Sequence, residues 1–126
     1  MLTRPHRLTS SRDFSDAVRR GRRVGTSTMV LHLLTAGSDA DQPVRVGFVV
    51  GKAVGPAVTR SLVKRRLRAL ARDRLASLPR SSTLVVRALP PAARASYAAL
   101  GADMDRALAR SRKSTSARRS PSGTTA

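Results

Sequence analysis

Residues 44–68 read VRVGFVVGKAVGPAVTRSLVKRRLR, a strand pattern followed by a helix pattern. Residues 44–50 are a short apolar run rich in valine that Gly51 ends, so we expect a strand there. Gly55 and Pro56 form a break, and proline suits the first helical position because its missing N–H would have no intrahelical partner. Beyond the break, apolar residues recur at spacings of three and four as far as Leu78, which predicts a helix that Pro79 ends.

The chain before residue 44 contains signals for one helix and one more strand. Ser10 and Asp13 fit the [ST]-x-x-[DE] capping pattern, so a helix is expected over residues 11–20. Gly21 then stands where a left-handed helix cap is common. Residues 28–34 (TMVLHLL) are an apolar run between turn residues, which indicates a mostly buried strand, and residues 36–43 are expected to form a loop.

The chain after residue 78 is expected to add one strand and one helix. Residues 83–88 (TLVVRA) form a third strand pattern, and Pro90 and Pro91 are placed to open a final helix. The apolar residues of that helix, which we expect to be buried, are Ala93, Tyr97, Leu100, Met104 and Leu108. After Arg110 the chain has almost no apolar residues, so residues 111–126 are expected to form a disordered basic tail.

The expected order is helix, strand, strand, helix, strand, helix, with an optional short strand near Lys52. This order predicts an α+β fold in which one small sheet packs with helices in a two-layer sandwich. A chain of 126 residues suits one compact domain, which we place at residues 1–110, before the tail.

The charge of the chain points to a polyanionic partner. Lysine and arginine number 25 and aspartate and glutamate 7, which gives a net charge of +18. Nucleic acid is therefore the first partner to expect, and an anionic membrane surface the second. The absence of cysteine excludes disulfides, thiolate zinc sites and cysteine nucleophiles. No apolar run is long enough to span a membrane, and residues 1–8 lack the apolar core of a signal peptide, so we expect a cytoplasmic protein.

The long helix in the middle of the chain has a concentrated basic face. At 3.6 residues per turn, Lys64, Arg65, Arg68 and Arg72 share a face beside the apolar stripe, with Arg60 at its edge. The cluster occupies the first half of the helix, where the macrodipole is positive and each cation costs about 0.3–1 kcal/mol. A run of charged residues on a helix usually forms a solvent-exposed face without a partner. The unfavourable end of the dipole and the net charge favour contact with a phosphate backbone instead.

Taken together, these segments resemble the protein component of bacterial ribonuclease P. Residues 55–68 (GPAVTRSLVKRRLR) are similar to the family signature Gly-Asn-Ala-Val-x-Arg-Asn-Arg-x-Lys-Arg-x-x-Arg, and residues 45–52 (RVGFVVGK) to its Arg-Val-Gly-Leu-x-Val-x-Lys strand. Arg7, Leu8, Asp13, Phe14 and Gly21 match the first helix of the family. The resemblance extends over residues 4–110 in the order of the family.

The resemblance implies two sets of site residues. Together with the basic helix face, it assigns RNA binding to a basic set, namely Lys52, Arg60, Lys64, Arg65, Arg66, Arg68 and Arg72. It assigns a cleft between the first helix and the sheet, which would hold the 5′ leader of precursor tRNA, to Phe14, Val18, Val30 and His32. Two of these positions are often aromatic in the family. Val18 and His32 reduce the stacking area, so leader binding here is expected to depend more on charge.

Three positions depart from the family signature. Pro56 and Ser61 stand where the family has asparagine, and Leu62 stands where it has the second arginine. Pro56 keeps the start of the helix, whereas Ser61 loses the paired donor and acceptor of an amide. Leu62 removes a cation, and we expect Arg66 to compensate for it.

The resemblance implies a ribonucleoprotein subunit that does not itself catalyse the reaction. Family members bind a large catalytic RNA and precursor tRNA, and the RNA with magnesium performs the 5′ cleavage. The implied partners are ribonuclease P RNA and precursor tRNA, with no membrane and no small-molecule substrate. We expect no catalytic residue, metal site or cofactor in the protein. The implied fold is a ribosomal-protein-like sandwich with a left-handed strand–helix–strand crossover, against the usual right-handed rule.

Two other functions fit part of the sequence. A protein nuclease needs several converging carboxylates, yet Asp103 and Asp105 are two apart on a helix and should point away from each other. Asp13 and Asp16 suit the N-terminus of the first helix, where they offset its dipole. A small basic ribosomal-type protein that only scaffolds RNA would share the charge, the tail and the fold. The combined order of first helix, Val-Gly strand and basic helix favours the ribonuclease P family.

Overall fold

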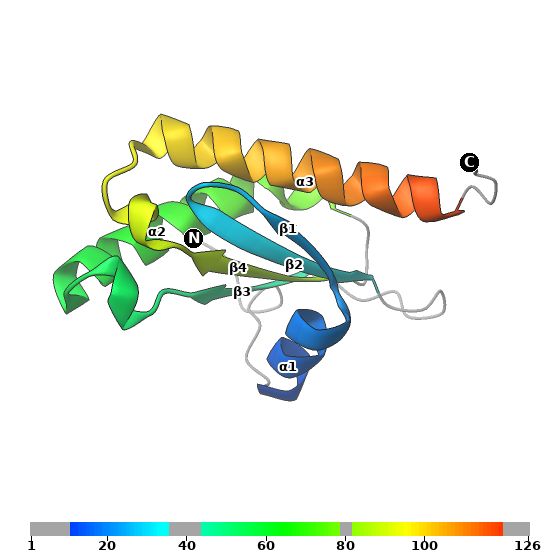
Figure 1. Ribbon diagram of the computed structural model, residues 1–126, viewed down its shortest axis with the longest axis horizontal. Coiled ribbons are helices and arrows are strands. Elements are labelled where there is room, and N and C mark those ends of the chain that lie inside the picture. Colours follow the sequence, from blue (N-terminus) through cyan, green and yellow to red (C-terminus); the bar gives the residue numbers. More distant parts are fainter. Residues whose placement is uncertain (1–10, 36–43, 79–81, 120–126) are drawn as a thin grey trace.

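A computed structural model describes residues 11–35, 44–78 and 82–119, and the side chains of residues 15–35, 44–78 and 82–111 (Figure 1). The helices are α1 (Ser11–Arg20), α2 (Ala57–Arg74) and α3 (Tyr97–Arg119), and the strands are β1 (Arg22–Gly25), β2 (Met29–Thr35), β3 (Arg45–Val49) and β4 (Ser82–Ala88). Short 3₁₀ turns occupy Lys52–Val54, Leu75–Ser77 and Pro90–Ala93. The predicted helix over residues 11–20 and the predicted α+β class are confirmed.

The four strands form one sheet in the order β1-β2-β4-β3. Strands β1 and β2 form an antiparallel hairpin, and β2 is also antiparallel to β4. Strands β3 and β4 are parallel and are joined through α2, so they form the strand–helix–strand unit that the sequence led us to expect. Strand β1 has no counterpart among the predicted elements, because four residues with two arginines carry too little periodicity to identify.

Helices α2 and α3 cover one face of the sheet, and the short α1 lies against the other (Figure 1). Alternate residues of the central strands, such as Leu31 and Leu84, point toward α2 and α3 and are fully buried. They pack with Leu67 of α2 and Met104 of α3 in one continuous apolar core. On the opposite face, a much smaller cluster centres on Ala17 of α1 and Val85 of β4.

A buried carboxylate ties the β1–β2 turn to α3. Asp103 accepts hydrogen bonds from the hydroxyls of Thr28 (2.6 Å) and Ser27 (3.3 Å) through Oδ2, and Oδ1 lies 2.6 Å from the Arg106 guanidinium. These contacts, above all the bond from Thr28, hold the pKa of Asp103 below its usual value of 3.8. The Asp103 carboxylate therefore has a structural role, because it holds the turn between β1 and β2 against α3.

Two glycines fix how helices meet strands. Gly55, just before α2, has φ 155° and ψ −169°, a conformation that only glycine adopts readily, and a Cβ there would lie 3.2 Å from Thr59. Gly21 does not adopt the left-handed conformation that we expected from its position. Glycine is needed here because the backbone passes close to the end of α1: a Cβ at residue 21 would lie 2.4 Å from the Ala17 carbonyl oxygen.

Several predicted boundaries differ from the structure. The residues near Lys52 form a 3₁₀ turn and not an extra strand. Pro56 precedes α2 as its cap, outside the first turn, and α2 ends at Arg74 before a 3₁₀ turn that leads to the buried Leu78. Pro90 and Pro91 open a separate 3₁₀ turn that ends at Ala93, and α3 begins only at Tyr97. Ser96 caps α3, because its hydroxyl accepts a hydrogen bond from the Ala99 N–H (3.0 Å).

Helix α3 also departs from its expected limits. It begins at Tyr97, whose side chain is 44% exposed where we expected it to be buried, because the residue lies in the first turn beyond the sheet. At the other end, α3 passes residue 110 and reaches Arg119, and Ser111 is buried. The coil expected from residue 111 is therefore helical as far as 119. Residues 120–126 and the loop expected at 36–43 lie outside the described residues.

Candidate nucleic-acid interface

The side of α2 that faces away from the core is basic. Arg65 and Arg72 are exposed there, and Lys64 and Arg68 are half-buried beside them. Arg72 makes one loose ion pair, 3.6 Å from the carboxylate of Asp73, which at this exposure contributes little. The predicted grouping of these four residues on one face of the helix is confirmed, and this group is called the α2 basic face below.

Two arginines of the predicted RNA-binding set have structural contacts. Arg60 donates from Nε to the carbonyl of Gly55 (3.1 Å), and so supports the turn that starts α2. Arg66 donates from Nη1 to the carbonyl of Ala95 (3.3 Å), which links α2 to the segment before α3. Both side chains are half-buried, so their aliphatic parts pack while their remaining donors are available. Lys52 is exposed in the 3₁₀ turn after β3 and is separate from the α2 basic face in the chain.

The start of α2 has no anionic group to offset its dipole. Its first turn contains no acidic residue, and Pro56 provides no side-chain acceptor for the first N–H groups. The sequence has no aspartate or glutamate between Asp41 and Asp73. The free N–H donors and the positive end of the helix dipole favour binding of phosphate groups near Arg60, in the first turn. The α2 basic face runs from the middle of α2 to its last turn, so the expectation that it occupies the first half of the helix is wrong.

A second basic region lies on the sheet, on the side of α1. The register pairs Arg23 with His32 across β1 and β2, and Val30 with Arg87 across β2 and β4. Paired residues point to the same face, so these four side chains form a continuous patch, called the α1 face below. Arg23 and Arg87 are exposed, whereas Val30 and His32 are buried at its base.

His32 is the most unusual residue of the α1 face. It is 4% exposed, and its Nδ1 has no hydrogen-bond partner among the residues that the structure describes. Burial, together with the positive charges of Arg23 and Arg87, lowers the pKa of His32 below 6.5. The imidazole is therefore neutral at pH 7 and offers a buried polar atom beside two exposed cations.

The four predicted leader-cleft residues are distributed over the sheet and α1. Val30 and His32 lie on the same face of β2, but both are buried, so their contact with a leader stays a prediction. Val18 of α1 is 43% exposed, next to Ala17, which packs on Val85. Phe14 belongs to α1, but its side chain lies outside the described residues, so its place in a cleft stays a prediction.

Sequence reasoning missed Arg23 and Arg87. The signal for Arg87 was present, because Leu84, Val86 and Ala88 alternate with it and face the core, which leaves Arg87 on the opposite side. Arg23 could not be found in this way, since the strand that carries it was not predicted.

The acidic residues of α3 are separated, as their spacing predicts. Asp103 is buried against the β1–β2 turn, and Asp105 is exposed and forms a two-bond ion pair with Arg74 (2.6 and 3.1 Å). No group of three or more potential metal ligands occurs within residues 11–35, 44–78 and 82–119. Among the same residues, no helix is long and apolar enough to cross a membrane.

Comparison with known sequences gives consistent relatives. The model of the family named Ribonuclease P matches residues 2–112. The ribonuclease P protein component of Nocardioides sp. is 58% identical over 110 residues, which cover 87% of this chain and 94% of that protein. The protein of the same name from Streptomyces griseus is 53% identical over 116 residues, with coverage of 87% and 94%.

Solved structures share the fold. The RNase P protein of Staphylococcus aureus superposes with a TM-score of 0.71 at 23% identity and covers 82% of this chain and 92% of that one. The RNase P protein from Thermotoga maritima gives a TM-score of 0.70 at 24% identity, with coverage of 82% and 96%. With a family model that matches most of its length and relatives above 50% identity, this chain belongs to the ribonuclease P protein family.

Proposed function

We propose that the chain divides two RNA contacts between its two basic regions within the ribonuclease P ribonucleoprotein. The α2 basic face binds the RNA subunit, and the α1 face binds the 5′ leader of precursor tRNA. The RNA subunit, with magnesium, carries out the cleavage that matures the 5′ end. The observation that carries this proposal is the presence of two separate basic surfaces, one on the outer side of α2 and one on the sheet beside α1.

The character of each surface supports its assigned partner. The α2 basic face is cationic, and the start of α2 adds uncapped N–H groups, which suits the backbone of a folded RNA. The α1 face combines exposed arginines with buried Val30 and His32 at its base. Because Val30 and His32 leave little surface for base contact, the support comes from the exposed arginines, which suit the phosphates of a single-stranded leader.

The acidic residues support RNA-based catalysis. Asp103 and Asp105 are each engaged in structural ion pairs, so neither is free to join a two-metal site. We therefore expect purified protein to leave precursor tRNA intact, and addition of ribonuclease P RNA and magnesium to give 5′ cleavage. Cleavage by RNA-free protein that persists through stringent repurification would refute this part of the proposal.

The assignment of the two surfaces can be tested with three arginine variants of equal charge change. In the reconstituted holoenzyme, Arg65→Gln should weaken binding of the RNA subunit and reduce the slope of log affinity against log salt by about one unit. Arg87→Gln should leave binding of the RNA subunit unchanged. It should weaken binding of precursor tRNA with a long leader more than binding of mature tRNA. Arg110→Gln, an exposed position in the middle of α3, is the control for net charge. If Arg87→Gln and Arg110→Gln act alike, the α1 face does not bind the leader.

Phe14 provides a further test of the leader assignment. In the holoenzyme, Phe14→Ala should lower affinity for precursor tRNA with a leader of several nucleotides and hardly affect mature tRNA. If the ring instead packs inside the protein, the variant should lose about 3–5 kcal/mol of stability and keep its leader preference when folded. Thermal unfolding measured beside both affinities distinguishes the two roles.

A further inference from the structure

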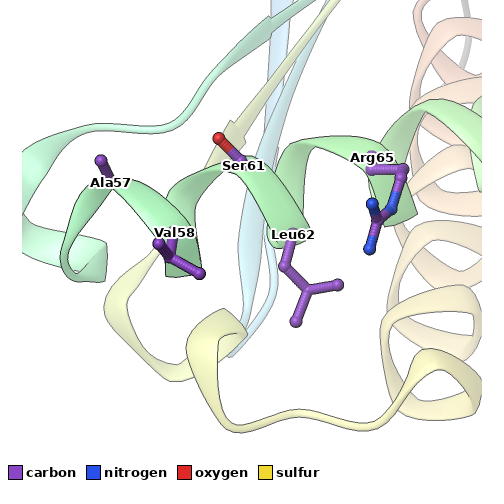
Figure 2. A pocket seen from close by; sticks show the side chains of 5 residues that line it. All are labelled: Ala57, Val58, Ser61, Leu62 and Arg65. Carbon is purple, nitrogen blue, oxygen red and sulfur yellow. The ribbon is translucent and has the colours of Figure 1, made fainter.

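A shallow apolar depression lies on the outer side of α2 (Figure 2). It is lined by Ala57, Val58, Ser61, Leu62 and Arg65 and has a volume of about 460 Å³. Val58, Leu62 and Arg65 follow one another at spacings of four and three, which brings them to one side of the helix. Figure 2 shows Val58 and Leu62 projecting together, with Arg65 on the next turn.

Folding does not account for these apolar side chains. Val58 is 83% exposed, more than any other large apolar residue of the described part of the chain, and Leu62 is half-buried. A β-branched residue in the first turn of a helix also favours the helix less than most alternatives. The core side of α2 is supplied by other residues, such as Val63 and Leu67. Val58, together with the uncovered part of Leu62, therefore suits contact with a partner.

The surroundings of the depression define the charge of that partner. Arg65 forms one wall, Lys64 and Arg68 lie beside it, and α2 has no acidic residue before Asp73. A partner that fits must carry negative charge close to a flat or apolar group. A nucleotide has both within one unit, since its base offers an apolar face a short distance from its phosphate.

We propose that this depression binds one unstacked base of ribonuclease P RNA, with the phosphate of the same nucleotide on Arg65. The inference rests on the proposed function, in which the α2 basic face binds this RNA. The base face covers Val58 and Leu62, the Arg65 guanidinium pairs with the phosphate, and the Ser61 hydroxyl is available to a polar edge of the base. An unpaired or bulged nucleotide is required, because a base inside a helix does not expose its face.

The dependence on salt separates an apolar contact from an ionic one. Phosphate contacts release counterions and determine the slope of log affinity against log salt, whereas contact with a base face persists at high salt. Leu62→Gln keeps side-chain length and helix preference, so it should reduce affinity by about fivefold to tenfold at every salt concentration with an unchanged slope. Val58→Gln should act in the same direction and cannot disturb folding, because Val58 is almost fully exposed.

The experiment measures binding of a ribonuclease P RNA transcript from Nocardioides sp., whose protein is the 58% identical relative, across a range of salt concentrations. Tyr97→Gln is the matched control, because it removes another large exposed apolar side chain outside the depression. Probing of the bound transcript with dimethyl sulfate should show at least one base that the unmodified protein protects and the Leu62→Gln protein leaves reactive.

Three results would overturn the inference. One is equal loss of affinity in Leu62→Gln and Tyr97→Gln, and another is no base whose protection depends on Leu62. The third is Leu62-dependent binding to phosphatidylglycerol vesicles without Leu62-dependent binding to RNA, which would make the depression a lipid contact. Failure of the proposed function looks different: Arg65→Gln would then leave both the RNA affinity and its salt slope unchanged.

Discussion

The two faces of the sheet differ in how completely they are covered. On one face, α2 and α3 bury a continuous set of leucine, valine and methionine side chains. On the other, α1 covers a small cluster around Ala17 and Val85, and the neighbouring positions carry exposed arginines above a buried histidine. Because strand residues alternate, Leu31 and His32 are adjacent in the chain but belong to different environments. One face therefore provides most of the apolar packing of this domain, and the other is the face that we propose as a binding surface.

The largest expected effect tests the stabilising face. Leu31→Ala should cost about 2–5 kcal/mol, because it leaves a cavity among fully buried side chains. Val30→Ala, one residue away on the α1 face, should cost clearly less. Chemical denaturation of both variants measures the difference. Equal losses would mean that α1 packs its face of the sheet as tightly as α2 and α3 pack theirs.

The next effect concerns the link between the β1–β2 turn and α3. Asp103→Ala should cost about 1.5–3 kcal/mol, since it removes a buried acceptor of two hydroxyl hydrogen bonds and an ion pair. Asp105→Ala removes an exposed ion pair with Arg74 and should cost under about 1 kcal/mol. Because the folded-state pKa of Asp103 is lowered, its contribution is complete above 3.8 and declines as the pH falls through that lowered pKa. Acid denaturation that is identical in wild type and Asp103→Ala would contradict this role.

A smaller effect of opposite sign is expected on the α1 face. His32→Leu should raise stability by about 1 kcal/mol, because it replaces a buried polar atom that lacks a partner among the described residues. The lowered pKa of His32 means that the unfolded chain takes up a proton more readily below pH 6.5. Well above pH 6.5, protonation of His32 therefore costs no stability. As the pH falls from 6.5 toward the folded-state pKa, the free energy of unfolding declines. Unfolding measured at pH 7.5 and 5.5 should show a pH-dependent loss that His32→Leu reduces.

The smallest expected effect is electrostatic. Arg23→Gln should change stability by less than about 0.5 kcal/mol but raise the pKa of His32 toward 6.5, because one of the charges that opposes its protonation is removed. An NMR titration of the imidazole measures the shift. Arg110→Gln serves as the control. An unchanged titration in Arg23→Gln would show that β1 does not hold Arg23 beside His32.

Sequence periodicity was sufficient for the elements with long apolar repeats. The spacing in α2 and the alternating run in β4 identified both elements, and the charge pattern identified the α2 basic face. Strand β1 was missed because its pairing with β2, and not its own composition, makes it a strand. The 3₁₀ turns at Lys52–Val54 and Pro90–Ala93 were also missed, since their form depends on how neighbouring elements meet.

The candidate site could be predicted only where it depends on spacing within one element. A basic helix face follows from spacing along one element, so Lys64, Arg65, Arg68 and Arg72 were grouped correctly. The structural bonds of Arg60 to Gly55 and of Arg66 to Ala95 depend on tertiary contacts and could not be read from the chain. The α1 face depends on strand register, which places Arg23 and Arg87 around His32, and of these two arginines Arg87 alone has a local signal, in the alternation of β4.

The strand order has a consequence for how this protein is made on the ribosome. Strand β4 lies between β2 and β3 but is synthesised after both, so a nascent chain that ends at Leu78 can pair only β1 with β2. Strand β3 has no neighbour to bond with until residues 82–88 leave the exit tunnel. Products that stop early expose apolar strand surfaces that α2 cannot cover alone, which makes them targets for proteolysis and aggregation. Completion of β4 is therefore required before β3 can join the sheet.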